Sequence, residues 1–196
     1  MAKLTRSDLL SLERYAAERS EFRARAIARK KARALALGDH ASLLFEDRLT
    51  VQYQVQEMLR IERIFEPGAI QAELDAYNPL VPDGSNLKAT LLLEFVDPGE
   101  RARRLGQLAG IEHRVFAQVG GQPRQFAVAD EDQERSREDK TSAVHFLRFE
   151  FSPEAIAALR GAAPLAFGVD DLRLPIQVAV SEDLRGLLLA DFAERP

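Results

Sequence analysis

The stretch that decides the fold is residues 43–65, LLFEDRLTVQYQVQEMLRIERIF. From Asp47 onward it contains neither Gly nor Pro, and it is rich in Glu, Gln, Leu, Met and Arg, which favour helix. At about 100° per residue, apolar side chains gather on one side of this helix. They are Leu44, Val51, Val55, Met58, Leu59 and Phe65. The pattern predicts an amphipathic helix whose apolar face lies in the core.

Two charged residues interrupt that apolar face. Glu62 projects in nearly the same direction as Val51, and Arg48 projects between Val55 and Leu59. They cannot pair with each other, because they are 14 positions apart, which is roughly 21 Å along a helix. A charge among apolar side chains is costly unless it is paired or neutralised. Two interpretations stay open: a structural ion pair at each position, or a site with shifted pKa values.

The composition is typical of a soluble globular protein. The chain has 196 residues, of which 46% are hydrophobic and 30% charged, so we expect one domain with a substantial core. The absence of cysteine excludes disulfides, thiolate zinc sites and iron–sulfur clusters held by the chain. No apolar run is long enough to cross a membrane, and the N-terminus MAKLTRSDLL lacks the apolar stretch of a secretory signal. We therefore expect a cytoplasmic protein with no membrane partner.

Charge is distributed unevenly along the chain. The net charge is −4, but residues 1–40 carry ten Lys and Arg against five acids, which leaves about −9 for the remainder. Such asymmetry can mark an anion-binding arm. Aromatic residues are not interleaved with these arginines as a base-stacking platform requires. We expect a solvated basic face and no nucleic-acid partner.

The rest of the chain changes from helical periodicity to alternation. Helices are predicted up to Gly38, which would cap the second, and over residues 69–77. Strands are predicted over residues 87–96, 113–119, 122–129, 143–151, 165–169 and 176–180. Helices are inserted at residues 98–110, with Asp97 as the N-cap, and at residues 153–161, with Ser152 as the N-cap. Ser181 caps a last helix. The predicted fold is α+β, as a single domain over residues 1–196. A helical N-terminal half, about residues 1–80, packs on a largely antiparallel β-sheet, about residues 86–196, with inserted and C-terminal helices.

A charged segment at residues 130–141, DEDQERSREDKT, contains no apolar residue. It is either a surface loop or a lid over a site.

Familiar catalytic motifs are absent from the sequence. There is no P-loop, no G-x-G-x-x-G, no G-x-S-x-G and no H-E-x-x-H, and the three histidines lie far apart. We therefore expect no metal site and no cofactor. A weaker candidate pocket remains. It comprises Arg48, Glu57, Arg60, Glu62, Tyr77, Asn78, His145 and Arg148. His145 lies on an apolar strand face, where a histidine is either a satisfied core residue or a base. If His145 met Glu62, the pair could act as an oriented base.

Four long strings carry a resemblance to a known family. They are FEDRLTVQYQVQEMLRIERIF, AELDAYNPLVPDGSNLKATLLLEF, ERARRLGQLAGIEH and KTSAVHFLRFEF. They resemble the uncharacterised bacterial family known as domain of unknown function 3501, over nearly the whole chain. The chain departs from the family at residues 169–175, VDDLRLP, where a His-Pro and a nearby Tyr are expected. The resemblance implies no activity, cofactor or catalytic residue. It does imply genes for a rubrerythrin and an iron–sulfur oxidoreductase nearby, hence a peroxide or redox-stress context.

Two hypotheses of different class follow, and the sequence does not decide whether the protein is an enzyme. The first is a soluble, non-catalytic accessory protein that binds a redox partner or its own copy. An exposed apolar patch would support it. The second is a small-molecule-binding protein or enzyme with a pocket built around Glu62, Arg48 and His145. A deep pocket in which these side chains converge would support that instead.

Overall fold

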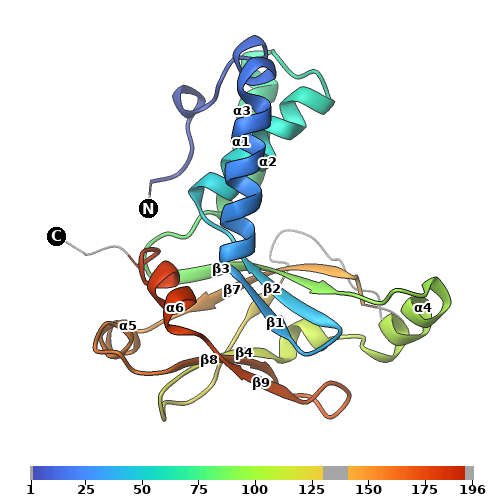
Figure 1. Ribbon diagram of the computed structural model, residues 1–196, viewed down its shortest axis with the longest axis vertical. Helices are drawn as coiled ribbons and strands as arrows, with labels where there is room; N and C mark the ends of the chain where they lie inside the picture. Colours follow the sequence, from blue (N-terminus) through green and yellow to red (C-terminus); the bar gives the residue numbers. More distant parts are fainter. Residues whose placement is uncertain (1, 130–140, 193–196) are drawn as a thin grey trace.

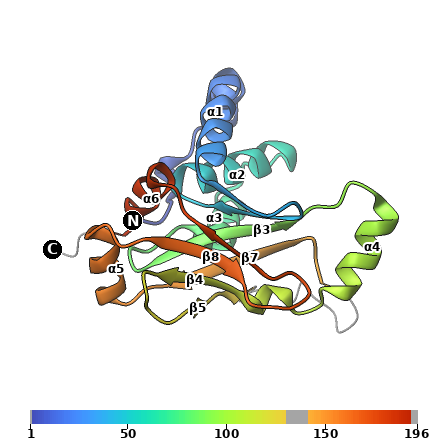
Figure 2. The ribbon, with the colours of Figure 1, turned by 60° about the horizontal axis from the view of Figure 1, so that its bottom comes forward.

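A helical arm rises from a body of two β-sheets (Figure 1). The structure is a computed structural model that describes residues 2–129 and 141–192. Seen from below, the arm stands on the side of one sheet, away from the other (Figure 2). The predicted α+β fold with antiparallel sheets is confirmed. The predicted helical half, about residues 1–80, is not purely helical, because the strands Ala34–Leu37 and Ala41–Phe45 lie within it.

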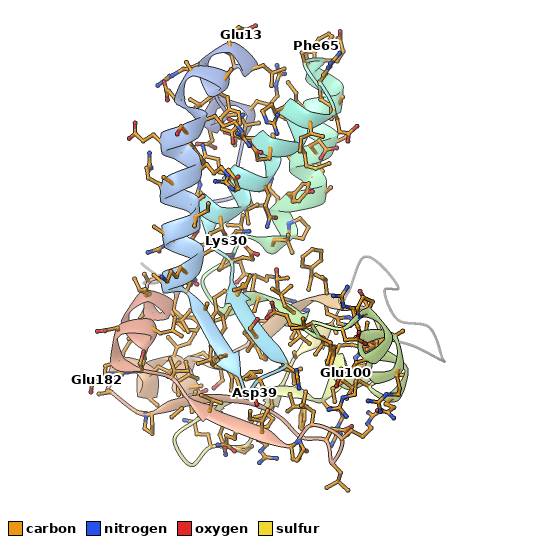
Figure 3. The ribbon with its side chains drawn as sticks, turned by 45° about the vertical axis from the view of Figure 1, so that its right-hand side comes forward. Glu13, Lys30, Asp39, Phe65, Glu100 and Glu182 are labelled. Carbon is orange, nitrogen blue, oxygen red and sulfur yellow. The ribbon has the colours of Figure 1, made fainter. Side chains whose placement is uncertain are left out.

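The arm is built from helices α1 (Leu12–Ala32), α2 (Arg48–Ile61) and α3 (Pro67–Tyr77), with α2 between the other two. Side chains from the N-terminal segment, α2 and α3 form its apolar core. They are Leu4, Val51, Val55, Leu59, Leu74 and Val81. The predicted core face of the central helix is therefore confirmed at Val51, Val55 and Leu59. Figure 3 shows Glu13 and Phe65 at the far end of the arm and Lys30 near the body.

The central helix is shorter than predicted at both ends. The side chain of Asp47 accepts a hydrogen bond from the Thr50 backbone N–H, and the Thr50 hydroxyl accepts one from the Asp47 N–H. This reciprocal cap starts α2 at Arg48. Leu44 belongs instead to strand β2 (Ala41–Phe45), which pairs with β1 (Ala34–Leu37). Gly38 lies in the turn between them with φ of 71°, so the predicted helix end at Gly38 was wrong.

The described residues of the body form two antiparallel sheets. The first has the order β1-β2-β3-β7-β6, with β3 (Asn86–Leu93), β7 (Val144–Glu150) and β6 (Val128–Ala129). The second has the order β5-β4-β8-β9, with β5 (Gln125–Phe126), β4 (Val115–Val119), β8 (Leu165–Val169) and β9 (Ile176–Ala179). Strand β3 is central, as predicted, but it ends before Val96, which is 99% exposed.

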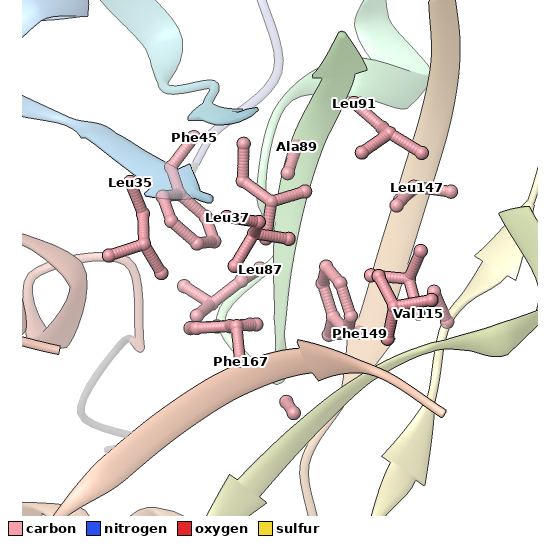
Figure 4. Packing of buried hydrophobic residues seen from close by; sticks show 14 of the residues in the cluster. Leu35, Leu37, Phe45, Leu87, Ala89, Leu91, Val115, Leu147, Phe149 and Phe167 are labelled. Atoms are coloured by element: carbon pink, nitrogen blue, oxygen red, sulfur yellow. The ribbon is translucent and has the colours of Figure 1, made fainter. Parts of the chain in front are cut away.

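The two sheets share one apolar core, shown in Figure 4. The ring of Phe167 lies 4.9 Å from that of Phe45 and 5.0 Å from that of Phe149, centroid to centroid. At one corner Ala127 separates β5 from β6 and donates its N–H to the carbonyl of Val115 at 2.9 Å. The predicted hairpin after β4 is therefore present, but its second strand is split between the sheets.

Three short helices close the ends of the body. They are α4 (Pro98–Gln107), α5 (Pro153–Arg160) and α6 (Glu182–Leu189). The caps predicted from the sequence, Asp97, Ser152 and Ser181, each accept a backbone N–H at the helix start. The predicted loop or lid at residues 130–141 lies outside the described residues except for Thr141.

Candidate partner-binding arm

Helix α2 ends in a left-handed turn that lacks the usual glycine. Arg63 adopts φ of 54°, and the N–H of Ile64 bonds the carbonyl of Leu59 at 2.9 Å. This is the Schellman pattern, in which the left-handed position normally belongs to Gly. Ile64 then packs against the arm core, which contains Leu59. The turn therefore directs Ile64 inward and releases the next residue, Phe65, toward solvent.

The arm tip, residues 61–66, displays two large apolar side chains. Ile61 is 56% exposed and Phe65 is 69% exposed. Phe65 stands at the far end of the arm in Figure 3. Single exposed apolar residues are common on protein surfaces, whereas neighbouring ones at a projecting end are typical of contact sites.

A carboxylate beneath the tip fastens α1 to α2. Glu57 accepts two hydrogen bonds from Arg19, both at 2.8 Å, and one from the Tyr15 hydroxyl at 2.7 Å. Arg60 adds a further contact at 3.2 Å. The hydrogen bonds from Arg19, followed by those from Tyr15 and Arg60, lower the pKa of Glu57 to about 2. Two predicted site residues, Glu57 and Arg60, are thus brought together, in a structural cluster.

A second buried network fixes the arm to the body. Arg33, fully buried, follows α1 and donates to the carbonyls of Phe45 at 3.0 Å and Leu187 at 2.9 Å. It also pairs with Asp191, which is itself buried after α6. Burial raises the pKa of Asp191 to about 6 in spite of Arg33. Because the partners come from α1, β2 and the C-terminal helix, the arm is held at a fixed position.

Two of the predicted site residues hold the N-terminal segment. Arg48 forms an ion pair with Asp8 at 2.6 Å. The side-chain amide of Asn78 bonds both the N–H and the carbonyl of Leu4, at 2.7 and 3.0 Å. Tyr77 is half-buried and packs against the arm core. Of the two interpretations of Arg48, a structural ion pair or a site residue, the structure shows an ion pair.

Glu62 is the clearest correction to the sequence interpretation. It is the C-cap residue of α2 and is exposed, so it does not lie in the apolar core. Periodicity alone placed it beside Val51, but the helix ends one residue earlier, at the solvent-exposed tip.

His145 is buried in the body and does not meet Glu62. Its Nε2 lies 2.8 Å from the hydroxyl of Thr141 and 3.0 Å from the carbonyl oxygen of Ser142, with a carboxylate oxygen of Glu112 at 3.9 Å. The Thr141 hydroxyl donates a hydrogen bond to a carboxylate oxygen of Glu112 at 3.0 Å. Since a carbonyl can only accept, Nε2 is the protonated nitrogen of His145. That nitrogen is thus a donor rather than a base. Arg148, on the same strand, pairs with Glu150.

A groove of about 710 Å³ lies on the body and includes none of the predicted pocket residues. Arg114 and Arg124 both pair with Asp170 there, at 3.0 and 2.8 Å. Arg124 also lies 4.2 Å above the ring of Phe116. Both guanidinium groups are therefore engaged within the fold.

The described part of the chain lacks metal-binding and membrane-spanning features. Across residues 2–129 and 141–192, no three His, Asp or Glu side chains are grouped so that they could hold a metal ion. Within the same ranges, no helix has the length and apolarity needed to span a membrane.

Several residues that matter here escaped the sequence interpretation. Ile61 was not singled out. Phe65 was predicted to lie on the core face of the central helix, which was wrong: the helix ends at Ile61, and Phe65 follows the left-handed turn at Arg63 and is 69% exposed. Nothing in the local sequence indicates that Arg33 pairs with Asp191, because the two residues are 158 positions apart.

Comparisons with known proteins agree with this description. A crystal structure of a protein of unknown function from Burkholderia pseudomallei matches with a TM-score of 0.92 and 50% identity. The match covers 98% of this chain and 100% of that one. No curated protein matches the chain. The family model described as "Protein of unknown function (DUF3501)" matches residues 3–192. The chain therefore belongs to this family of unknown function.

Proposed function

We propose that this protein is a non-catalytic accessory protein that binds a partner protein through its arm tip. The observation that carries the proposal is the exposure of Ile61 and Phe65 at the end of a rigidly held arm. A few side chains buried at the centre of a protein–protein contact, many of them aromatic, supply most of its energy. A rigid support reduces the conformational entropy lost on binding.

The alternative was a pocket around Glu62, Arg48 and His145. Glu62 lies at the arm tip, Arg48 lies at the opposite end of α2, and His145 lies inside the body. Arg48 and His145 each have partners within the fold. The placement of these residues therefore gives no support to a common pocket.

The partner in this proposal is a redox protein or a second copy of the chain. The family resemblance implies a bacterial setting of peroxide or redox stress, in which an accessory protein would meet oxidoreductases. The cytoplasmic location is the expectation from composition. This part of the proposal depends on the resemblance, whereas the contact surface depends on the geometry of the arm.

Site-specific photo-crosslinking tests the proposal. A photoreactive phenylalanine analogue replaces Phe65 in one variant and Val96 in a control. Val96 is a 99% exposed apolar residue of the body. We expect a discrete adduct in cells from position 65 and none from position 96. An adduct at twice the chain mass of 21.9 kDa would identify a second copy as the partner. Identical adduct patterns from both positions, or no adduct from position 65, would contradict the proposal.

A further inference from the structure

The second half of α1 carries cations that form no ion pair within the described residues. Residues 22–33, FRARAIARKKAR, contain six basic residues and no acidic one. Arg29 pairs with Asp47 at 2.5 Å, and Arg33 pairs with Asp191. Across residues 2–129 and 141–192, four cations of this stretch form no ion pair. They are Arg23, Arg25, Lys30 and Lys31.

An exposed apolar residue lies among these cations. Ile27 is 46% exposed, although α1 buries Phe22 and Ala26 against the rest of the arm. On a helix surface, residues three and four apart are neighbours. Arg23 therefore lies one turn before Ile27, and Lys30 and Lys31 lie one turn after it. We call this surface, formed by Arg23, Ile27, Lys30 and Lys31, the α1 face.

Folding requirements explain only part of the α1 face. Cations in the last turn of a helix interact favourably with its dipole, which accounts for Lys30 and Lys31. Arg25 lies 5.7 Å from the centre of the Phe22 ring, a cation–π contact. Arg23 is exposed in the middle of the helix with neither role. The exposure of Ile27 likewise contributes nothing to the core.

The chemistry of the α1 face selects among anionic partners. The whole chain has a net charge of −4, so its positive potential is local to this part of the arm. Nucleic acids bind through many phosphate contacts over an extended basic surface, and such domains are usually strongly basic overall. A protein surface with an apolar side chain ringed by carboxylates matches both the central Ile27 and the surrounding cations.

We propose that the α1 face binds an acidic protein surface, on which an apolar side chain surrounded by Asp and Glu meets Ile27. This inference rests on the proposed function and names the chemistry of its partner. The α1 face is the charged part of the contact, which determines orientation and association rate, whereas the arm tip is the apolar part.

A synthetic amphipathic peptide tests the proposal. It carries leucine at heptad a and d positions, glutamate at the remaining ones, and a fluorescent label for anisotropy measurements. We expect binding at low salt that weakens at physiological salt. Arg23→Glu should weaken it about tenfold and Ile27→Ser about fivefold. The matched control is Arg103→Glu, which makes the same charge change at an exposed residue of α4 and should alter affinity less than about twofold.

The outcomes distinguish an acidic protein from other anionic partners of the α1 face. The proposal is overturned if the peptide does not bind, or if Arg103→Glu weakens binding as much as Arg23→Glu. It is also overturned if duplex DNA or vesicles of anionic lipid bind more tightly than the peptide, since those are different partners. Failure here with a retained crosslink at position 65 would remove the acidic partner and leave the partner-binding function in place. Loss of that crosslink would remove the proposed function itself.

Discussion

Replacing Arg33 by alanine should destabilise the protein more than any other loss of a charged side chain in the arm. The side chain is fully buried and donates to backbone carbonyls of Phe45, Glu46 and Leu187. It is also the cation paired with the buried Asp191. Removing it leaves a carboxylate and several carbonyls in the interior without their donor.

The size of the effect follows from that arrangement. Breaking a buried ion pair by removing one partner costs about 3–5 kcal/mol. Unfolding free energies of single domains are about 5–15 kcal/mol, so the variant should lose a large part of its stability. The control is Arg23→Ala on α1, the helix that Arg33 follows. Arg23 is exposed and has no ion-pair partner in the described residues, so its loss should cost less than about 0.5 kcal/mol.

The pH dependence of the stability gives a second expectation, with a defined direction. Burial raises the pKa of Asp191 from 3.8 to about 6. Between these values the folded chain holds a proton on Asp191 that the unfolded chain does not hold. Protonation of Asp191 therefore favours the folded state as pH falls through this window. In Arg33→Ala the ionised carboxylate lacks its cation at pH 7, whereas below the folded pKa it is neutral. The stability difference between wild type and variant should consequently narrow at pH 5.

Urea denaturation monitored by far-ultraviolet circular dichroism at pH 7 and pH 5 measures the loss of stability in Arg33→Ala and its change with pH. A loss below about 1 kcal/mol at pH 7, or a wider difference at pH 5, would refute the reasoning about this network.

Three further substitutions test individual parts of the arm. Arg63→Gly should stabilise the protein by about 1 kcal/mol, seen as a higher Tm, because glycine adopts the left-handed turn without strain. Glu62→Gln should leave the urea midpoint unchanged within about 0.5 kcal/mol, since Glu62 is exposed at the tip; a large shift would mean that it has a buried cationic partner. Glu57→Gln should destabilise the protein at neutral pH, measured by the same denaturation. Because Arg19 lowers the pKa of Glu57 to about 2, the wild-type advantage should be complete above its ordinary value of 4.5 and disappear as pH falls toward 2.

Local sequence patterns predicted the features that depend on neighbours along the chain. Helical periodicity identified Val51, Val55 and Leu59 as core residues, and all three are buried. The rule that Ser and Asp cap helices located the starts of α4, α5 and α6. Alternation located the strands whose apolar face is continuous, such as β3 and β7.

The missed elements are those for which two local patterns compete. Residues 34–45, ALALGDHASLLF, are rich in Ala and Leu, which favour helix, yet they form the β1–β2 hairpin. Here burial decides, because Leu35, Leu37, Leu43 and Phe45 alternate into the body's core. The prediction of the arm tip failed for a related reason. Arg63 occupies the left-handed position at which a glycine would have indicated the end of the helix.

Partners of buried charges could not be predicted because they are distant in sequence. His145 was correctly recognised as lying on a buried strand face, but its neighbours Glu112 and Thr141 depend on how η3 (Ile111–Arg114) packs against β7. Asp191 lies among apolar residues near the C-terminus, and nothing local indicates that it meets Arg33. The sequence can show that a buried charge needs a partner, but the tertiary fold determines which partner it has.

The distribution of unfavourable features supports the arm as the contact surface. Two costly groups inside the protein are compensated: Arg33 has Asp191 and three carbonyls, and Glu57 has two arginines and a tyrosine. On the arm surface, costly groups lack such partners within the described residues. The left-handed Arg63 costs about 1 kcal/mol relative to glycine, and Phe65 remains in water. The unpaired cations of the α1 face repel one another. Stability alone would favour a glycine at position 63, a polar residue at position 65 and alternating charges along α1. A partner that covers the tip and neutralises the α1 face would offset these costs only in the complex.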